Sequence, residues 1–395
     1  MADFSFQPTG SIFEEREALL EEWTPDKLVG RDKELQQYHA ALQPVIEGET
    51  PSNIFLYGKS GVGKTAATRF LLTRLEYDAE QIAGLDLHRI EINCDGLNSS
   101  YQTAVALVNE LRDPNNQISN TGYPQSSVYE FLFDELDKLG GTVLIVLDEV
   151  DHIQDDSLLY KLPRARSNDD ISDVRLGVIG ISNDLSFRNQ LSSKVRSSLC
   201  EKEVSFSAYN ATELQEVLRQ REEVAFQNGV LDDGVIQMCA AYGAKDSGDA
   251  RQALDLLLES GDIAREKNAD LVTEEHVREA RERLQTNQVI EGISNYSTHG
   301  QLVLWSLTIL AKQGETPART REIRDPYEQL CEQEGTDPVS DRAVREYLAE
   351  LKTLGIISST QENRGKGGGK YKKHELEQSV ESVREGLSEL FEAPV

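Results

Sequence analysis

A glycine-rich octapeptide near residue 60 has the residue types and the spacing that can hold a phosphate chain. Residues 58–65 read GKSGVGKT and match the pattern G-x-x-x-x-G-K-[ST]. In such a loop the backbone N–H groups curl around phosphate oxygens, Lys64 brings positive charge to the β- and γ-phosphates, and the Thr65 hydroxyl completes the coordination of Mg²⁺. The residues expected to hold the nucleotide here are Gly58, Gly61, Val62, Gly63, Lys64 and Thr65. The octapeptide therefore predicts a site for ATP or ADP with Mg²⁺.

Two carboxylates follow an apolar run farther along the chain. Residues 143–147 read VLIVL, which is typical of a buried strand, and Asp148 and Glu149 come directly after them. Ligands of open parallel sheets bind at the carboxyl ends of the strands, so both side chains are expected beside the phosphates. Asp148 suits the water shell of the metal ion, together with Thr65, and Glu149 suits the polarisation of an attacking water. The pair predicts that ATP is hydrolysed as well as bound.

The elements that would position these groups form an α/β pattern. The octapeptide follows the strand-like residues 54–57 and opens a helical pattern. Further short apolar runs, separated by longer helical segments, lie at 89–93, 143–147, 176–181 and 204–206. Strands that alternate with helices indicate a parallel sheet, here in a nucleotide-binding domain at 1–206. An all-α domain is expected at 207–292, with helices over 214–226, 232–242, 248–267 and 273–287.

The C-terminal residues 293–395 predict a winged-helix domain. Helical patterns at 302–311, 320–333 and 340–354 precede a candidate β-hairpin. In the third of these helices a buried stripe follows the i, i+3, i+4, i+7 spacing through Val344, Tyr347, Leu348 and Leu351. A basic face of the same helix, expected to contact DNA, consists of Arg342, Arg345 and Lys352.

A second basic cluster lies at the turn of the candidate hairpin. Residues 364–373 carry no acid and five cations, namely Arg364, Lys366, Lys370, Lys372 and Lys373. The whole chain has a net charge of −28, which repels polyanions when screening is weak. In molar salt the Debye length falls to roughly 3 Å, so remote carboxylates no longer oppose a local basic contact. The two basic clusters therefore predict double-stranded DNA as a partner, and the acidic composition is typical of a halophile.

Several segments resemble one protein family over nearly the whole chain. They read SIFEEREALL, ETPSNIFLYGKSGVGKT, VLDEVD and GDARQALDLL. These segments are similar to the archaeal DNA replication initiators of the origin-recognition-complex-subunit-one type, which are AAA+ ATPases related to the cell-division-control-six proteins. The resemblance implies an AAA+ sheet domain, an all-α lid and a winged helix. It also implies origin DNA and the replicative helicase as partners, self-assembly on DNA, and a slow Mg²⁺-dependent ATPase that serves as a switch.

The resemblance assigns roles to residues outside the octapeptide. Asn183 and Arg251 resemble the two sensor residues that act with Asp148 and Glu149 at the γ-phosphate. Four further residues resemble positions that line the adenine pocket or contact ATP, namely Gly30, Arg31, Tyr209 and Arg221.

An insertion and a short basic segment complete the family pattern. The insertion at 155–173 resembles the initiator-specific helix that touches DNA through Tyr160 and Arg164, although its composition alone predicts a solvated charged helix. The segment of the trans-acting finger contains both Lys194 and Arg196. Because arginine is the better clamp for phosphate charge, Arg196 is the expected finger. A salt bridge between sheet and lid is the alternative role for this residue.

Two other classes of function are open at this point. One is a transcription regulator that uses the nucleotide as a switch, and the other is an AAA+ loader, such as a clamp-loader subunit, that acts on protein partners. A regulator does not need Glu149 and both sensors, and a loader does not need the basic hairpin, so their joint presence favours the initiator. The chain has no apolar run of about 18 residues, no signal-peptide pattern and no paired cysteines. These features predict a cytoplasmic protein without a membrane partner.

Overall fold

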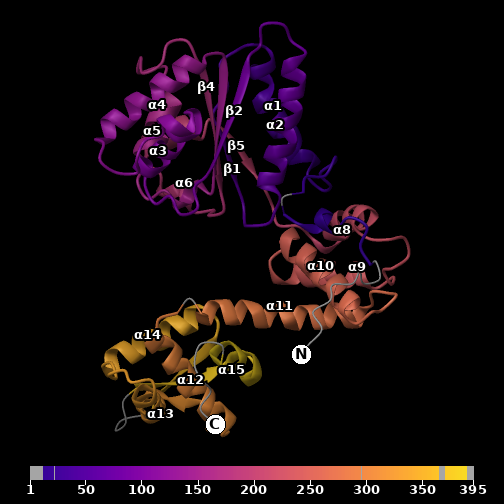
Figure 1. The fold of residues 1–395 in the computed structure, drawn as a ribbon, viewed down its shortest axis with the longest axis vertical. Helices are drawn as coiled ribbons and strands as arrows, with labels where there is room; N and C mark the ends of the chain where they lie inside the picture. Colours follow the sequence, from indigo (N-terminus) through magenta and orange to yellow (C-terminus); the bar gives the residue numbers. More distant parts are fainter. Residues whose placement is uncertain (1–11, 22, 295, 364–369, 389–395) are drawn as a thin grey trace. The chain divides into compact units, whose positions relative to one another are not determined.

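The computed structural model describes residues 12–21, 23–294, 296–363 and 370–388 (Figure 1). The chain divides into two compact units, residues 1–277 and 278–395. The division falls inside helix α11 (Glu274–Ser294). The sequence placed a domain boundary at 292/293, which lies near the end of the same helix.

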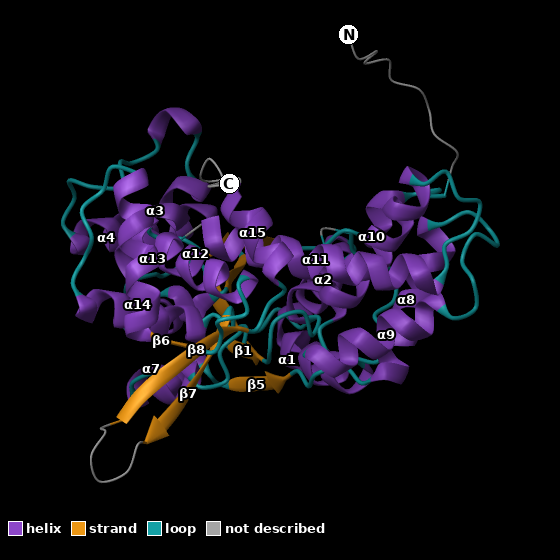
Figure 2. Cartoon of the chain, turned by 90° about the horizontal axis from the view of Figure 1, so that it is seen from below, coloured by secondary structure: helices purple, strands orange, loops and turns teal. Residues whose placement is uncertain are grey.

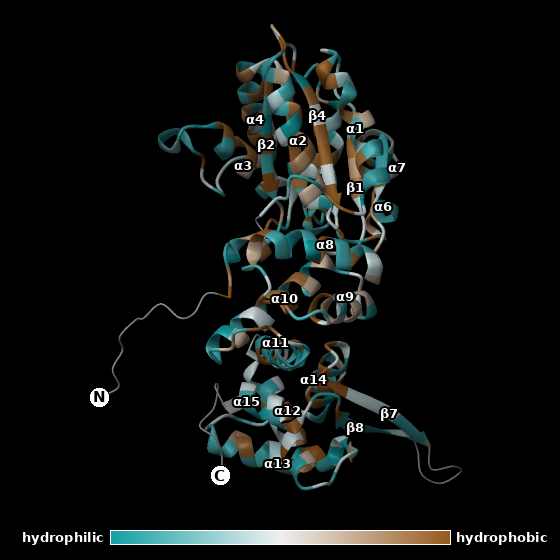
Figure 3. Ribbon diagram, turned by 90° about the vertical axis from the view of Figure 1, so that its right-hand side faces the viewer, coloured by the Kyte–Doolittle hydropathy of each residue, from teal (hydrophilic) through white to brown (hydrophobic). Residues whose placement is uncertain are grey.

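The first unit is built around a five-stranded parallel sheet. Its strand order is β2 (Leu87–Asn93), β3 (Thr142–Asp148), β4 (Arg175–Ser182), β1 (Ile54–Tyr57) and β5 (Lys202–Ser205). The central strands β1, β3 and β4 are almost wholly buried and apolar, as the brown colour of β1 and β4 in Figure 3 illustrates. A strand buried on both faces reads as a continuous apolar run, which is why the sequence predicted the central strands, and with them the α/β class, correctly. The edge strands β2 and β5 are more exposed, and their shorter apolar signals were also predicted as strands.

Helices cover both faces of this sheet. Helices α1 (Asp32–Ile46) and α2 (Lys64–Glu80) lie on one face (Figure 1). The other face carries α3 (Ser100–Leu111), α4 (Gln125–Leu139), α5 (Ser157–Lys161), α6 (Phe187–Gln190) and α7 (Ser193–Leu199). Leu56 of β1 belongs to the core under α1 and α2, whereas Phe55 belongs to the core on the opposite face. This alternation of side chains ties both helical layers to one strand.

Helices α8 (Ala211–Ala225), α9 (Val235–Asp246) and α10 (Ala250–Glu266) form the all-α part of the first unit. A capping box opens α8, because Asn210 Oδ1 accepts from the Glu213 N–H (3.0 Å) and Glu213 Oε2 accepts from the Asn210 N–H (2.8 Å). The N-terminal segment also packs here, with the ring of Phe13 tilted against that of Phe226 at a centroid distance of 5.0 Å.

The second unit has the winged-helix arrangement that the sequence predicted. Helices α12 (Thr298–Lys312), α13 (Thr320–Gln333) and α14 (Asp341–Thr353) pack with strands β7 (Ile357–Asn363) and β8 (Lys370–Leu376), which form the long hairpin in Figure 2. Two further elements escaped the sequence analysis, the short strand β6 (Ala318–Arg319) beside β8 and the helix α15 (Val380–Ser388). Val344, Leu348 and Leu351 are buried as predicted, and Tyr347 packs against the same core.

Within the described residues, no helix has the length and apolar character needed to cross a bilayer.

Candidate nucleotide pocket and nucleic-acid groove

The glycine-rich octapeptide connects β1 to α2, as predicted. Gly61 and Gly63 have positive φ angles of 66° and 91°, a conformation that residues with a Cβ rarely adopt. Gly61 also lies so close to the carboxylate of Asp249 that a side chain would collide with it. The Ala250 N–H, at the start of α10, donates to the carbonyl oxygen of Gly61 (3.0 Å). Tight packing against the all-α part therefore explains the glycine at position 61.

Lys64 lies inside the loop, with 4% of its surface exposed. Its Nζ donates to the carbonyl oxygens of Gly58 (2.9 Å) and Lys59 (2.6 Å) and to Oδ1 of Asn183 (2.8 Å). Burial lowers the pKa of Lys64 to about 8, although the nearby carboxylate of Asp148 favours the charged form. A bound phosphate chain would supply the negative charge that this buried ammonium lacks.

Thr65 and Asp148 meet at the predicted metal position. Thr65 Oγ1 donates to Asp148 Oδ2 (2.8 Å), and Asp148 Oδ1 accepts from the Glu149 N–H (2.9 Å). Hydroxyl and carboxylate oxygens are the hard ligands that Mg²⁺ prefers, so this pair fits the ion.

Glu149 and Asn183 lie next to each other at the carboxyl end of the sheet. Asn183 Nδ2 donates to Glu149 Oε1 (3.3 Å), so this one amide contacts both Lys64 and Glu149. Glu149 has a positive φ of 53°, which is unusual for a residue with a side chain and is common where function constrains the backbone. The sheet edge thus brings the predicted catalytic residues Asp148, Glu149 and Asn183 together beside the loop.

A pocket of about 340 Å³ extends from these residues toward the all-α part. Lys64, Thr65 and Asp148 lie on its wall together with the following residues from elsewhere in the chain: Leu20, Glu21, Trp23, Asn93, Tyr209, Arg221 and Arg251. The sequence analysis missed Glu21 and Trp23. The tripeptide Trp-Thr-Pro at residues 23–25 could have indicated them, because it places an aromatic residue in a polar segment shortly before helix α1.

Arg221 and Arg251 approach the pocket from α8 and α10. Arg221 lies over the ring of Trp23 (4.1 Å) and donates from Nη2 to the Trp23 carbonyl oxygen (3.3 Å). Burial lowers the pKa of Arg221 to about 10. Arg251 Nη1 donates to Ser60 Oγ (3.4 Å), and its guanidinium forms an ion pair with Glu21. Both arginines therefore lie on the wall of the pocket, and their contacts with ATP stay predictions.

Arg31 has a different environment from the one expected. It is 1% exposed, donates from Nε to the Val62 carbonyl oxygen (2.9 Å) and from Nη2 to the Ser207 carbonyl oxygen (2.8 Å), and stacks at 3.5 Å on the ring of Tyr209. Gly30 faces the same ring. Arg31 thus supports the phosphate loop from behind and does not line the pocket. Its guanidinium also contacts the Glu34 carboxylate (3.5 Å) and the ring of Phe206 (5.8 Å).

The insertion is more deeply packed than its composition suggested. Leu158 and Leu159 of α5 are buried in the core of the sheet domain, so the prediction of a fully solvated helix is wrong. Tyr160 is half-buried, and Arg164 lies over its ring at 5.0 Å. The charged residues at 166–170 are exposed.

The finger candidates lie on α7, away from the pocket wall. Lys194 is exposed and Arg196 is half-buried near the end of this short helix. A role in trans for either residue stays a prediction.

A concave groove of about 780 Å³ marks the second unit. It lies between α13, α14 and the hairpin, and its basic lining residues are Arg319, Arg321, Arg324, Arg345, Lys352 and Lys372. The sequence analysis named Arg345, Lys352 and Lys372 but missed the three arginines of residues 319–324. Their clustering around the start of α13 was visible in the sequence, but only the tertiary structure shows that they line the groove together with residues of α14.

Several predicted DNA-contacting residues are placed differently. Arg342 does not line the groove, and its Nε donates to Glu346 (2.9 Å) on the solvent side of α14. Lys373 pairs with Glu362 (3.1 Å) and also lies off the groove, because neighbouring residues of β8 point to opposite faces. Lys370 begins β8, but its side chain is not described, and Arg364 and Lys366 lie outside the described residues.

The floor of the groove contains a buried histidine. His374 is 3% exposed, and its Nδ1 and Nε2 contact the hydroxyls of Ser359 (2.8 Å) and Thr320 (3.2 Å). Burial lowers the pKa of His374 to about 4, and the positive charges of Lys372 and Lys352 act in the same direction. The neutral ring thus joins β7, β8 and α13.

This histidine predicts that the second unit loses stability in acid. Because the pKa is lower in the folded than in the unfolded chain, the stabilisation is complete above about pH 6.5 and is lost as pH falls toward about 4, by up to about 3 kcal/mol. His374→Gln should flatten this slope between pH 6.5 and 4. Denaturant unfolding followed by Trp305 fluorescence in a Trp23→Phe background measures it. His39→Gln, at an exposed position, is the control, and equal slopes for all three proteins would contradict the assignment.

Comparison with known families defines the class of protein. Residues 27–171 match the family described as AAA ATPase domain, 215–282 match the Cdc6 AAA+ ATPase-type lid domain, and 291–386 match the CDC6 C terminal winged helix domain. The parallel sheet with its phosphate loop, the all-α part and the winged helix are thus those of an AAA+ ATPase of the Cdc6 type.

Individual relatives narrow this class. The chain is 56% identical over 382 residues to ORC1-type DNA replication protein 11 of Haloarcula marismortui. This alignment covers 97% of this chain and 92% of the relative. It is 46% identical to ORC1-type DNA replication protein 10 of Halobacterium salinarum, over 98% and 94% of the two chains. The structure of the Aeropyrum pernix ORC1 protein in complex with DNA matches with a TM-score of 0.81 and 37% identity, over 96% and 97% of the chains. This chain belongs to the ORC1-type DNA replication proteins.

Proposed function

We propose that this protein starts DNA replication by binding double-stranded origin DNA in a manner controlled by ATP. The observation that carries the proposal is the joint presence, in one chain, of a phosphate loop with its acidic partners and a basic groove in a winged helix. The Aeropyrum pernix relative, whose structure was determined in complex with DNA, supports DNA as the ligand.

ATP with Mg²⁺ is the proposed ligand of the pocket. Lys64 would hold the β- and γ-phosphates, and Thr65 and Asp148 would hold the metal ion, which neutralises phosphate charge when it is bound. Glu149 would orient and deprotonate the attacking water, and Arg251 would be drawn from Glu21 toward the γ-phosphate. Since Arg251 belongs to α10, this movement would change the position of the lid when the γ-phosphate is present.

The DNA is proposed to occupy the groove of the winged helix, with Arg345 at base edges and Lys372 at phosphates. Tyr160 and Arg164 of the insertion would add a second contact. Recruitment of the replicative helicase and self-assembly on DNA, with Arg196 acting on a neighbouring nucleotide, complete the proposal.

Genome-wide mapping of the sites that the protein occupies in its host tests the proposal. An initiator should cluster at one or a few replication start sites, and those sites should lose firing activity when the protein is depleted. Scattered occupancy at promoters with unchanged replication profiles would contradict it and favour a transcription regulator. Occupancy that follows moving replication forks would favour a loader.

A further inference from the structure

The N-terminal segment, residues 12–21, is attached to two helices of the lid. The Glu14 N–H donates to the carbonyl oxygen of Ala225 (2.9 Å), the last residue of α8. Arg16 forms an ion pair with Asp262 of α10 (2.6 Å). The path of the segment toward the nucleotide pocket is therefore set by α8 and α10.

The segment reaches the pocket at its end, with Glu21. A short 3-10 helix, η1 (Arg16–Leu19), buries the side chains of Ala18 and Leu19. The two residues that follow this helix, Leu20 and Glu21, line the pocket. A buried anchor thus places an exposed carboxylate on the pocket wall.

Arg251 connects Glu21 to the phosphate loop. Its Nη2 forms an ion pair with the Glu21 carboxylate, and its Nη1 donates to Ser60 Oγ (3.4 Å). Arg251 is the second residue of α10, and the first residue of this helix donates its N–H to the Gly61 carbonyl oxygen. The guanidinium therefore lies next to the loop that is expected to hold the phosphates, and it already has an anionic partner.

Glu21 and a γ-phosphate would use the same positive charge. A guanidinium binds carboxylate and phosphate oxygens through the same planar set of donors. In the proposed function ATP brings a γ-phosphate to Arg251, whereas ADP ends at the β-phosphate. ADP binding thus leaves the ion pair intact, and ATP binding has to break it. Because a ligand shifts an equilibrium only by its differential affinity for the two states, the ion pair subtracts from the affinity for ATP alone.

We propose that Glu21 is a positioning residue that lowers the affinity of the pocket for ATP relative to ADP by competing with the γ-phosphate for Arg251. The inference rests on the proposed binding of ATP, and it adds a residue that determines the selectivity of that site. With ADP bound, Arg251 stays paired with the N-terminal segment. The Glu21 side chain is 56% exposed, so its carboxylate can turn to solvent when ATP takes its partner.

Isothermal titration of the full-length protein with Mg·ADP and with the Mg²⁺ complex of the β,γ-imido analogue of ATP tests the inference, because the analogue is not hydrolysed during the titration. Glu21→Gln should lower the Kd for the analogue about fivefold, the upper range for an ion pair of this exposure, and leave the Kd for ADP unchanged. In an Arg251→Ala background the same substitution should change neither Kd, since the competitor then has no partner to hold. Glu17→Gln, at an exposed position of the same segment that does not line the pocket, is the matched control and should match the wild type.

The outcomes separate this inference from the proposed function. Unchanged affinity of Glu21→Gln for the analogue, with both nucleotides bound by the wild type, overturns the inference alone. An equal gain in affinity for ADP and for the analogue also overturns it, since general repulsion between Glu21 and the phosphates would produce that pattern. Persistence of the effect in the Arg251→Ala background overturns it as well. Failure of the wild type to bind either nucleotide overturns both the inference and the ATP-binding part of the proposed function.

Discussion

Lys64→Ala should abolish measurable ATP binding, whereas Glu149→Gln should bind ATP normally and lose turnover. The Lys64 ammonium lies inside the loop with three oxygen partners, so its removal deletes the charge-assisted contacts to two phosphates at once, a loss of about 100-fold or more in affinity. In Glu149→Gln the amide keeps the shape of the side chain but accepts no proton, which predicts a fall in kcat of about 100-fold or more.

Isothermal titration with Mg·ATP and single-turnover hydrolysis measure the two effects separately. The control for the lysine variant is Lys59→Ala, at an exposed position of the same loop that does not line the pocket. Parallel loss of binding and turnover in Glu149→Gln would show that Glu149 holds the nucleotide instead of activating water. Normal affinity of Lys64→Ala would move the phosphates out of the loop altogether.

Arg345→Ala should weaken binding to the preferred DNA site by roughly 1–3 kcal/mol and relax base preference there, because an arginine in a major groove can bridge O6 and N7 of guanine. Arg345 lines the groove of the second unit. Arg342 lies three residues earlier on the same helix, is paired with Glu346 and does not line the groove, so Arg342→Ala is a matched control with a small expected effect.

Lys372→Ala should behave differently from both arginine variants. A strand lysine at the edge of the groove is suited to phosphate contact, so its loss should weaken all duplexes alike and reduce the slope of log K against log [salt] by about 0.9. Fluorescence anisotropy with specific and random duplexes over a series of KCl concentrations measures both quantities. Equal effects of Arg342→Ala and Arg345→Ala on the specific duplex would place the DNA on the outer face of α14 and contradict the assignment of the groove.

The phosphate loop and the sheet were predictable because their signals are local. A run of buried strand residues, three glycines and a lysine are adjacent in the chain, and the chemistry requires that adjacency. The carboxylates after β3 were predictable for the same reason, since a parallel sheet fixes which end of each strand meets the ligand. The α/β class and the winged helix were predicted correctly because their strands and helices have strong periodic patterns in the sequence.

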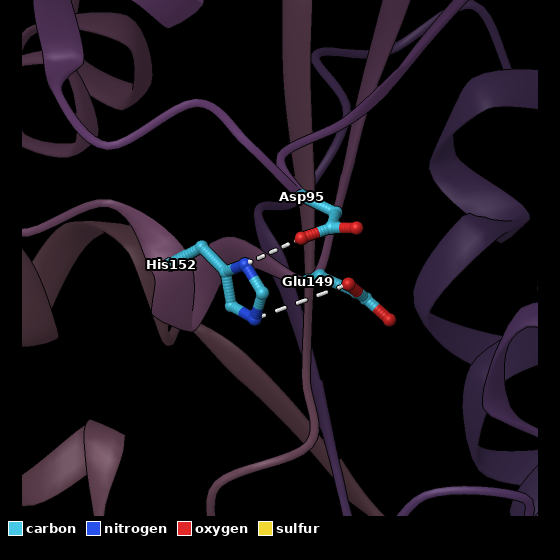
Figure 4. A group of neighbouring side chains, drawn as sticks. All are labelled: Asp95, Glu149 and His152. Carbon is cyan, nitrogen blue, oxygen red and sulfur yellow. Dashed lines mark ion pairs between the residues drawn. The ribbon is translucent and has the colours of Figure 1, made fainter. Parts of the chain in front are cut away.

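Side-chain pairing across the fold was not predictable. Helical periodicity grouped Arg342 with Arg345 on one basic face, but it could not show that Arg342 is paired with Glu346 and lies off the groove. Nothing near Arg31 in the sequence indicates that Val62 and Ser207 take up its guanidinium, because these partners are 31 and 176 residues away. The side chains of Asp95 and His152, which lie 3.2 Å apart (Figure 4), are likewise brought together only by the pairing of β2 with β3. Such contacts depend on tertiary structure and have no local signature.

The hydrogen bond from the Ala250 N–H to the Gly61 carbonyl oxygen joins the phosphate loop directly to the first residue of helix α10. The helix has 17 residues and is therefore roughly 25 Å long. A small rotation of the helix about its contact with the loop would move its far end by a larger distance. A side chain at position 61 would collide with the carboxylate of Asp249 and so disturb the contact between the loop and helix α10. The coupling between the phosphate loop and helix α10 thus depends on a residue that contributes no functional group of its own.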